Sequence, residues 1–264
     1  MSGDLTWFVF ALPDESRHLV EGQVPALLAK LGEEVGGRFA ASYLDMMDRI
    51  AVTNDEASLR GVWEFAVAGE DEYASLPIWY EADPDFQFSL HFSLTAPLQA
   101  MISVDDGYFA YDEPIPLARF SRLMQTWSLL YRELRPVYGY GPGSPETSGW
   151  QLGLSQPAMV YDCSIFGPAL VEKYGRDMLL NLPTWRTETY SDGGMLLQMC
   201  DGPLSGKYKS KHIGDYELAA ERLGLATERW VWATRNPKEY LEEIRARGNP
   251  FHRPPTSTSG PKQE

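Results

Sequence analysis

The stretch FQFSLHFSL, from Phe86 to Leu94, is the part of the 264-residue sequence that decides the fold. Aromatic or aliphatic side chains occupy every second position, and Gln, Ser, His and Ser lie between them. A period of two residues is typical of a β-strand that buries one face and leaves the other face polar. The sequence therefore predicts a strand of a sheet with one apolar face.

Further short runs rich in aromatic or β-branched residues lie on both sides of this strand. Acidic turns separate them, namely Glu70-Asp71-Glu72, Asp83-Pro84-Asp85 and Asp105-Asp106-Gly107. Such runs joined by turn-forming residues are typical of an antiparallel meander. The strands predicted for this meander are residues 58–68, 76–80, 86–94 and 101–111.

Helices are predicted where apolar residues recur at intervals of three and four. Residues 20–35 and 117–134 show this spacing, and Pro136 ends the second segment. Residues 5–12 are expected to form a first strand. A later block, residues 159–200, is expected to run strand, helix, strand and returning strand. Together these elements predict the α+β class, with antiparallel sheets and flanking helices.

The stretch GYGPGSPETSG, residues 139–149, is rich in Gly, Pro and Ser and is the best candidate for a linker. We expect residues 1–247 to form one α+β unit; a division into two related lobes, residues 1–138 and 150–247, is the alternative. The last 17 residues, 248–264, are dominated by Pro, Ser, Thr and charged residues. This composition predicts a disordered tail.

Negative charge is concentrated in the first half of the chain. Residues 1–118 hold 21 acidic and five basic side chains, a net charge of −16, whereas the other 146 residues hold 16 acidic and 18 basic side chains, a net charge of +2. Proteins that grip nucleic acid do so with an excess of Lys and Arg. The charge therefore argues against a nucleic-acid binder and is compatible with a basic protein partner.

Cysteine content and hydropathy point to a cytoplasmic protein without a membrane segment. Two cysteines cannot form a disulfide framework, and no stretch of 18 apolar residues occurs. The apolar start, residues 5–12, lacks the basic flank and cleavage site of a signal peptide.

No signature of catalysis or metal binding stands out. The four histidines, His18, His91, His212 and His252, show no metal spacing, and no G-x-S-x-G nucleophile motif is present. Cys163 and Cys200 fall in predicted strands, where an inert buried thiol is the usual state. We therefore expect no catalytic residues, no metal and no cofactor.

The strongest candidate site combines carboxylates with aromatic residues between positions 63 and 113. Aromatic anchors ringed by charge are typical of a tight interface with an oppositely charged protein. The alternative is that the aromatic residues belong to the core and the acids to turns. The partner-binding residues predicted on this basis are Glu64, Glu70, Asp71, Glu72, Trp79, Glu81, Asp83 and Asp85.

A family resemblance is carried by the segment 162–204. It contains FGPALVEKYGRDMLL from Phe166, then PTWR from Pro183 and GGMLLQ from Gly193, and LRPVYGYG from Leu134 precedes it. This pattern resembles bacterial immunity proteins of polymorphic and type VI secreted toxin systems, and covers about a third of the chain. The residues after Cys200, up to Gly214, and the Pro-rich tail depart from the family pattern.

The resemblance implies a non-enzymatic cytoplasmic protein that binds and neutralises a cognate toxin, often a nuclease. The acidic half fits this function, because a nuclease cleft is positive and an acidic protein can occupy it. Two alternatives stay open. One is an enzyme or small-molecule binder that uses a cleft between lobes near Asp162, His91 or Cys163, and the other is an adaptor subunit of a bacterial complex.

Overall fold

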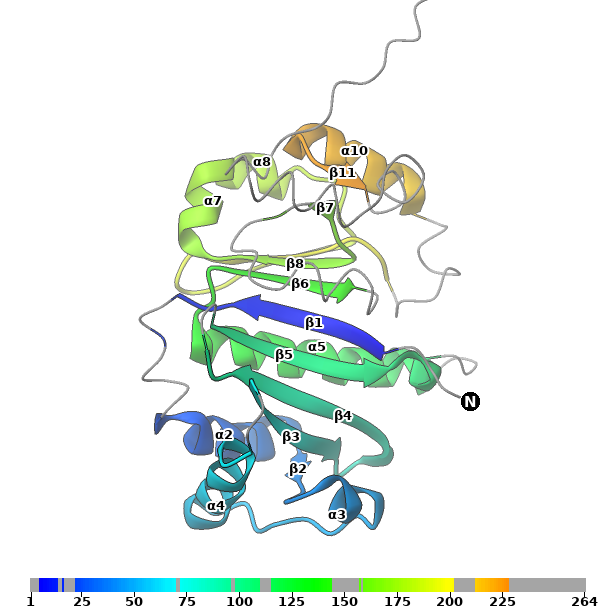
Figure 1. Ribbon diagram of the computed structural model, residues 1–264. Helices are drawn as coiled ribbons and strands as arrows, with labels where there is room; N and C mark the ends of the chain where they lie inside the picture. Colours follow the sequence, from blue (N-terminus) through cyan, green and yellow to red (C-terminus); the bar gives the residue numbers. More distant parts are fainter. Residues whose placement is uncertain are drawn as a thin grey trace, which may run out of the picture.

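The computed structural model confirms the α+β class (Figure 1). It describes residues 5–13, 16, 22–69, 72–95, 98–109, 115–143, 157, 159–201 and 212–227. Predictions for Glu70 and Asp71, for most of the 139–149 linker and for the 248–264 tail lie wholly or partly outside these residues.

A nine-stranded sheet, counted over the described residues, runs through the molecule in the order β2-β3-β4-β5-β1-β6-β8-β10-β9, with every neighbouring pair antiparallel. The strands are β1 (Leu5–Ala11), β2 (Gly37–Phe39), β3 (Tyr73–Tyr80), β4 (Asp83–Ser93), β5 (Gln99–Asp105), β6 (Tyr138–Gly143), β8 (Cys163–Phe166), β9 (Arg186–Thr189) and β10 (Met195–Gln198). A separate parallel pair joins β7 (Met159–Val160) to β11 (Ala226–Thr227).

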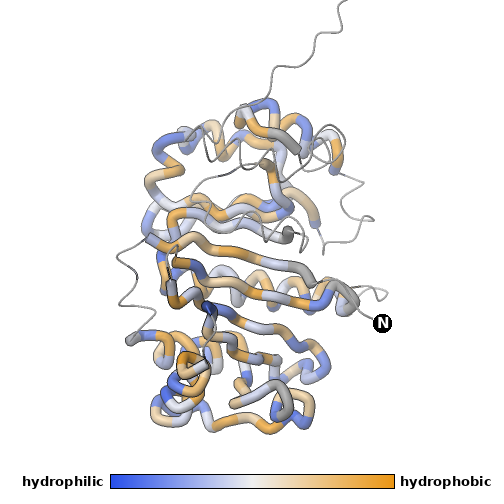
Figure 2. The backbone as a smooth tube through the Cα atoms, in the orientation of Figure 1, coloured by the Kyte–Doolittle hydropathy of each residue, from blue (hydrophilic) through white to orange (hydrophobic). Residues whose placement is uncertain are grey.

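Two hydrophobic cores lie on opposite faces of the sheet. Phe8 and Phe10 of β1 belong to the first core, which is formed with α2 (Val24–Val35), α4 (Glu56–Val67) and α5 (Ile115–Leu134). Val9, between them, belongs to the core formed with α7 (Pro168–Tyr174), α8 (Arg176–Leu180) and α10 (Ile213–Leu223). Since successive side chains of a strand point to opposite faces, each helix group covers its own face. Figure 2 shows apolar and polar residues alternating along these helices.

Strand β4 confirms the period-two pattern of residues 86–94. Phe86, Phe88, Leu90 and Phe92 are buried in the first core, whereas Gln87 and His91 are only partly buried on the other face. The predicted helix at 117–134 is also confirmed as α5. A short 3-10 helix, Asp106–Phe109, and a short helix α3, Tyr43–Met47, complete the described elements.

The prediction of a strand at residues 58–68 is wrong, because this segment lies in helix α4. Asp55 caps the helix by accepting a hydrogen bond from the Ser58 N–H, and Leu59, Val62 and Trp63 are the buried residues of one stripe. Their spacing of three and four residues is helical, and a Ser or Asp residue at the cap position is a helix-start signal.

The prediction of a linker at 139–149 is wrong for its first residues, which form β6 in the middle of the sheet. Tyr138 and Tyr140 alternate with Gly139 and Gly141 along the strand. A Cβ on Gly139 would lie 2.5 Å from the Phe10 ring, and one on Gly141 would lie 2.5 Å from the Phe8 ring. The glycines therefore make room for aromatic rings and do not mark a flexible connection. The predicted lobe boundary falls partly inside a continuous sheet.

Candidate functional site

The predicted acidic patch is split between the two ends of the β3–β4 hairpin. Glu72 precedes β3, at the end where Tyr73 pairs with Ser93. Glu81, Asp83 and Asp85 lie at the other end, where Tyr80 pairs with Asp83. The eight residues of β3 separate these ends by roughly 23 Å. The carboxylates therefore form two groups and not one surface.

The group at the β3–β4 turn is neutralised by arginines from elsewhere in the chain. Glu81 pairs with Arg38 at 2.5 Å and Asp85 pairs with Arg49. Asp83 accepts two hydrogen bonds from Arg119, which hold the pKa of its carboxyl below its usual range. This turn therefore presents less negative charge to a partner than its sequence indicates.

The prediction of Trp79 as an exposed anchor is wrong. The indole is only 4% exposed and packs with Ala40 and Met46 beneath α3. Trp63 is also buried, in the first core, so the reading of these aromatic residues as core residues holds for both.

The other acidic residues, Glu64 and Glu72, lie in the last turn of α4 and after it, and an aromatic residue of the same turn that the sequence did not single out is exposed. Phe65 is 67% exposed and Val67 is 36% exposed. Glu64, beside Phe65, and Glu72, five residues after the helix, are also exposed. Phe65 lies off the stripe of Leu59, Val62 and Trp63, so a helical prediction for this segment would have found it. We call Glu64, Phe65, Val67 and Glu72 the α4-end surface.

The charge of the α4-end surface is unfavourable for the helix that carries it. The C-terminal end of a helix has a partial negative charge, which Lys or Arg in the last turn would stabilise. The last turn of α4 has no basic residue. It has Glu64 instead, and Glu70, Asp71 and Glu72 follow within five residues. The carboxylates therefore oppose the helix dipole, and local rules of stability do not explain this arrangement.

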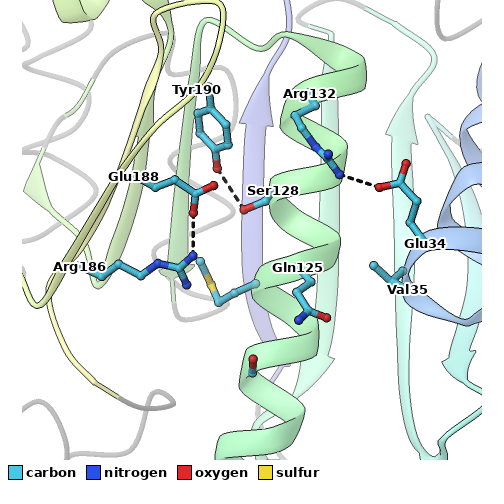
Figure 3. Close-up of a pocket in the computed structure, with 10 residues that line it drawn as sticks. Glu34, Val35, Gln125, Ser128, Arg132, Arg186, Glu188 and Tyr190 are labelled. Carbon is cyan, nitrogen blue, oxygen red and sulfur yellow. Dashed lines mark hydrogen bonds and ion pairs between the residues drawn. The ribbon is translucent and has the colours of Figure 1, made fainter.

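A pocket of about 390 Å³ lies over the outer side of α5, between the end of α2 and strand β9 (Figure 3). Two ion pairs line it, Arg132 with Glu34 at 2.8 Å and Arg186 with Glu188 at 2.7 Å. Because each cation already has a carboxylate, the pocket is polar but electrically balanced. The lining residues are Glu34, Val35, Ser121, Met124, Gln125, Ser128, Arg132, Arg186, Glu188 and Tyr190.

Tyr190 closes one end of this pocket against α5. Its ring stacks on Tyr131 at 4.2 Å, and its hydroxyl lies 3.0 Å from Ser128 Oγ. Burial raises the pKa of Tyr190 to about 12. The Tyr131 hydroxyl donates to the Asp192 carboxylate at 2.8 Å, which fixes the β9–β10 turn on the helix. These tyrosines therefore hold the pocket wall in place and are not groups that titrate near neutral pH.

The residues named for an enzyme do not meet in one place. Cys163 lies in the first core, with its Sγ 3.8 Å from Met124 Sδ. His91 lies on the opposite face of the sheet, since Leu90 and Phe92 beside it point into the first core. Asp162 is buried and accepts a hydrogen bond from Tyr216 of α10 at 2.6 Å. Among the described residues, no group of three His, Cys, Asp or Glu side chains could hold a metal ion.

His91 is tied to two serines on neighbouring strands. Its Nδ1 lies 2.8 Å from Ser75 Oγ and its Nε2 lies 2.7 Å from Ser103 Oγ. Burial lowers the pKa of the imidazole to about 4. The ring is therefore neutral at physiological pH and bridges β3, β4 and β5.

We expect the stability of the protein to fall on mild acidification because of His91. The unfolded chain takes up a proton near pH 6.5, but the folded protein does so only near pH 4, so the folded state loses stability as the pH falls through this interval. Between pH 7 and pH 5 the contribution of this group to the unfolding free energy should drop by about 2 kcal/mol. Urea unfolding of His91→Gln, compared with the unchanged protein at both pH values, measures it; an equal pH dependence in both would contradict the prediction.

The glycines of the family-like motif have structural explanations. A Cβ on Gly167 would lie 2.7 Å from the Val137 carbonyl oxygen and 2.8 Å from that of Pro136. Gly193 has a φ of +96°, which favours glycine, and a Cβ on Gly194 would collide with the Tyr131 hydroxyl. The motif therefore preserves the packing of α7 and of the β9–β10 turn.

Within the part of the chain that the structure describes, no helix combines the length and the hydropathy needed to cross a membrane.

Comparisons with known proteins show a likeness of fold. The sequence matches no protein-family model and no curated protein. The structure is similar to the Pseudomonas aeruginosa T6SS protein PA0821, with a TM-score of 0.50 and 12% sequence identity over 91% of this chain and 83% of that chain. A substrate-free duplicated taurocyamine kinase from Schistosoma mansoni aligns with a TM-score of 0.29 and 12% identity, over 91% of this chain and 33% of the kinase. The chain thus shares its overall fold with a protein of a type VI secretion system.

Proposed function

We propose that this protein binds a cognate secreted antibacterial toxin and neutralises it stoichiometrically, through the α4-end surface. The expected toxin is a nuclease with a basic cleft. The fold shared with a type VI secretion protein supports this context, as does the resemblance of residues 162–204 to immunity proteins.

The observation that carries the proposal is the exposed Phe65 in the last turn of a helix that also holds Glu64 and is followed by Glu72. A ring that is 67% exposed loses the benefit of burial, and the carboxylates oppose the helix dipole. A basic partner that covers this surface would bury the Phe65 ring and offset the negative charge at the helix end, so neither the exposed ring nor the carboxylates would then be unfavourable. The aromatic ring would then supply the buried contact, and Glu64 and Glu72 would direct a positively charged partner toward it.

The first experiment expresses the product of the neighbouring gene alone and together with this protein. We expect the neighbour alone to arrest growth, and we expect co-expression with this protein to restore growth and yield a stable purified complex. A harmless neighbour, or one that does not bind, would contradict the proposed function.

Variants of the α4-end surface then test where the toxin binds. We expect Glu64→Gln with Glu72→Gln to slow association about tenfold at low salt and to flatten its salt dependence. Phe65→Ala should speed dissociation by about tenfold or more, as at other aromatic anchors. Surface plasmon resonance against the purified toxin separates the two rates.

Helix α10 provides matched controls on the other face of the sheet. Glu217 and Glu221 are exposed, and Leu218 is 38% exposed. Glu217→Gln with Glu221→Gln removes the same amount of charge, and Leu218→Ala removes an exposed apolar side chain. Both controls should bind like the unchanged protein. If the α4-end variants also keep both rate constants, this surface is not the contact.

A further inference from the structure

Strand β9 is the last strand of the nine-stranded sheet and has a free edge within the described residues. It pairs with β10 on one side, from Arg186 opposite Gln198 to Thr189 opposite Met195. The other side has no partner strand in the part of the chain that the structure describes. An edge of this kind is a ready template for a further strand.

The hydrogen bonding of β9 shows which groups point outward. Tyr190 N–H donates to Gly194 C=O at 2.9 Å. In an antiparallel ladder, bonded and non-bonded residue pairs alternate, so Glu188 and Arg186 also face β10 with their peptide groups. Thr187 and Thr189 therefore turn their N–H and C=O groups toward the open edge.

The side chains of β9 are self-complementary. Glu188 lies opposite Leu196, which belongs to the first core, so Glu188 and Arg186 project on the α5 side of the sheet. They pair with each other at 2.7 Å across one intervening residue and remain about half and one-third exposed. A basic and an acidic residue two positions apart can pair with the same two residues of an antiparallel copy.

We propose that β9 pairs antiparallel with β9 of a second copy of this chain, about a two-fold axis at Thr187. The two Thr187 residues then exchange N–H···O=C bonds through their outward groups. Arg186 lies opposite Glu188 of the second copy, and Glu188 lies opposite Arg186 of the second copy. These are non-hydrogen-bonded pairs, in which the side chains of an antiparallel ladder come closest.

An exposed tryptophan lies at the end of the same edge. Trp185 is 52% exposed and directly precedes β9. Its N–H donates to the Gln198 C=O of β10 at 2.9 Å, so the regular alternation ends at Arg186 and the proposed ladder does not extend to Trp185. The strand is four residues long, so the interface is small and the dimer should form in the micromolar range.

The dimer is independent of toxin binding. Strand β9 is at one end of the strand order, whereas α4 packs against β3 near the other end. The test of the dimer uses the purified full chain alone and does not require the toxin to be known.

Charge reversal tests the register directly. R186E places a carboxylate opposite Glu188 of the second copy, and E188R places a guanidinium opposite Arg186 of the second copy. Each variant should raise the dimer dissociation constant at least about tenfold, measured by analytical ultracentrifugation. The double variant R186E/E188R restores opposite charges and should dimerise like the unchanged chain. An equimolar mixture of the two single variants should form a heterodimer.

Arg132→Glu is the matched control, because Arg132 lines the same pocket on α5 but lies away from the edge. It should dimerise normally. Thermal unfolding of every variant shows that the fold is intact. An unchanged chain that stays monomeric at high micromolar concentration would overturn the proposal. So would single variants that remain dimeric, or a mixture and a double variant that remain monomeric. If the unchanged chain is monomeric and R186E loses toxin binding, then the β9 edge contacts the toxin and not a second copy of this chain.

Discussion

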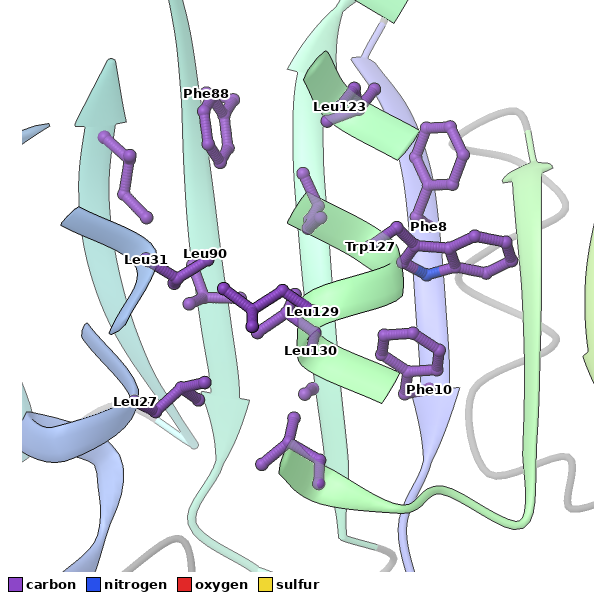
Figure 4. Packing of buried hydrophobic residues seen from close by; sticks show 14 of the residues in the cluster. Phe8, Phe10, Leu27, Leu31, Phe88, Leu90, Leu123, Trp127, Leu129 and Leu130 are labelled. Carbon is purple, nitrogen blue, oxygen red and sulfur yellow. The ribbon is translucent and has the colours of Figure 1, made fainter. Parts of the chain in front are cut away.

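Replacing Trp127 with alanine is expected to lower the free energy of unfolding by about 4 kcal/mol, within the range of about 3–5 kcal/mol for large aromatic residues in cores. The indole is fully buried on α5. It stacks on Phe10 at 5.2 Å and meets Phe8 edge-on at 5.4 Å, and these contacts join the helix to the central strand β1 (Figure 4). The neighbouring residues of β6, Gly139 and Gly141, have no side chains that could move into the cavity left by the indole.

Urea unfolding followed by circular dichroism measures this loss. Trp127→Phe should cost much less, because the ring contacts are retained and an indole N–H without a hydrogen-bond partner is removed. Gln125→Ala, on the exposed side of the same helix, is the control and should change stability by less than about 0.5 kcal/mol. A cost of less than 1 kcal/mol for Trp127→Ala would contradict the packing described for this core.

Replacing Arg119 with methionine is expected to lower the free energy of unfolding by about 3 kcal/mol. The side chain of Arg119 is 9% exposed and that of Asp83 is 21% exposed. The guanidinium donates to both carboxylate oxygens, at 2.8 and 3.2 Å, and lies over the rings of Phe86 and Tyr108. Its removal leaves a half-buried carboxylate without its bidentate partner, and this is the costly step.

The pair between Arg132 and Glu34 is the matched control, since both side chains are about half exposed. Arg132→Met should cost less than about 1 kcal/mol because solvent screens an exposed pair. The Arg119 pair should also depend on pH. Asp83 has a lowered pKa in the folded protein, so its contribution is present above about pH 4 and is lost as the pH falls through the folded value. Equal costs for the two methionine variants in urea unfolding would contradict the prediction.

Local periodicity was sufficient to predict the elements that have one apolar face. The alternation at residues 86–94 predicted β4, and the helical stripe at 117–134 predicted α5. In both, the repeat of the sequence matches the repeat of the backbone, so a single segment contains the information. The α+β class followed from these elements.

Local patterns gave wrong predictions where the same residue type is compatible with two structures. The apolar content of residues 58–68 predicted a strand, but Asp55 and the spacing of Leu59, Val62 and Trp63 produce α4. The glycines of β6 indicated a linker, although they accommodate Phe8 and Phe10. The signals for α4 are local and were outweighed by the apolar content, whereas the role of the glycines is not visible until the partner strand β1 is known.

The candidate site shows the same division between sequence and structure. The sequence by itself determined that the negative charge lies in the first half of the chain and that carboxylates flank aromatic residues there. Only the tertiary structure decided that Arg38, Arg49 and Arg119 neutralise the turn at Glu81, Asp83 and Asp85 and that Trp79 is buried. The reason is that these ion pairs join residues 36 or more positions apart and that Trp79 packs against residues 33 or more positions away, which are brought together by folding and by no local repeat.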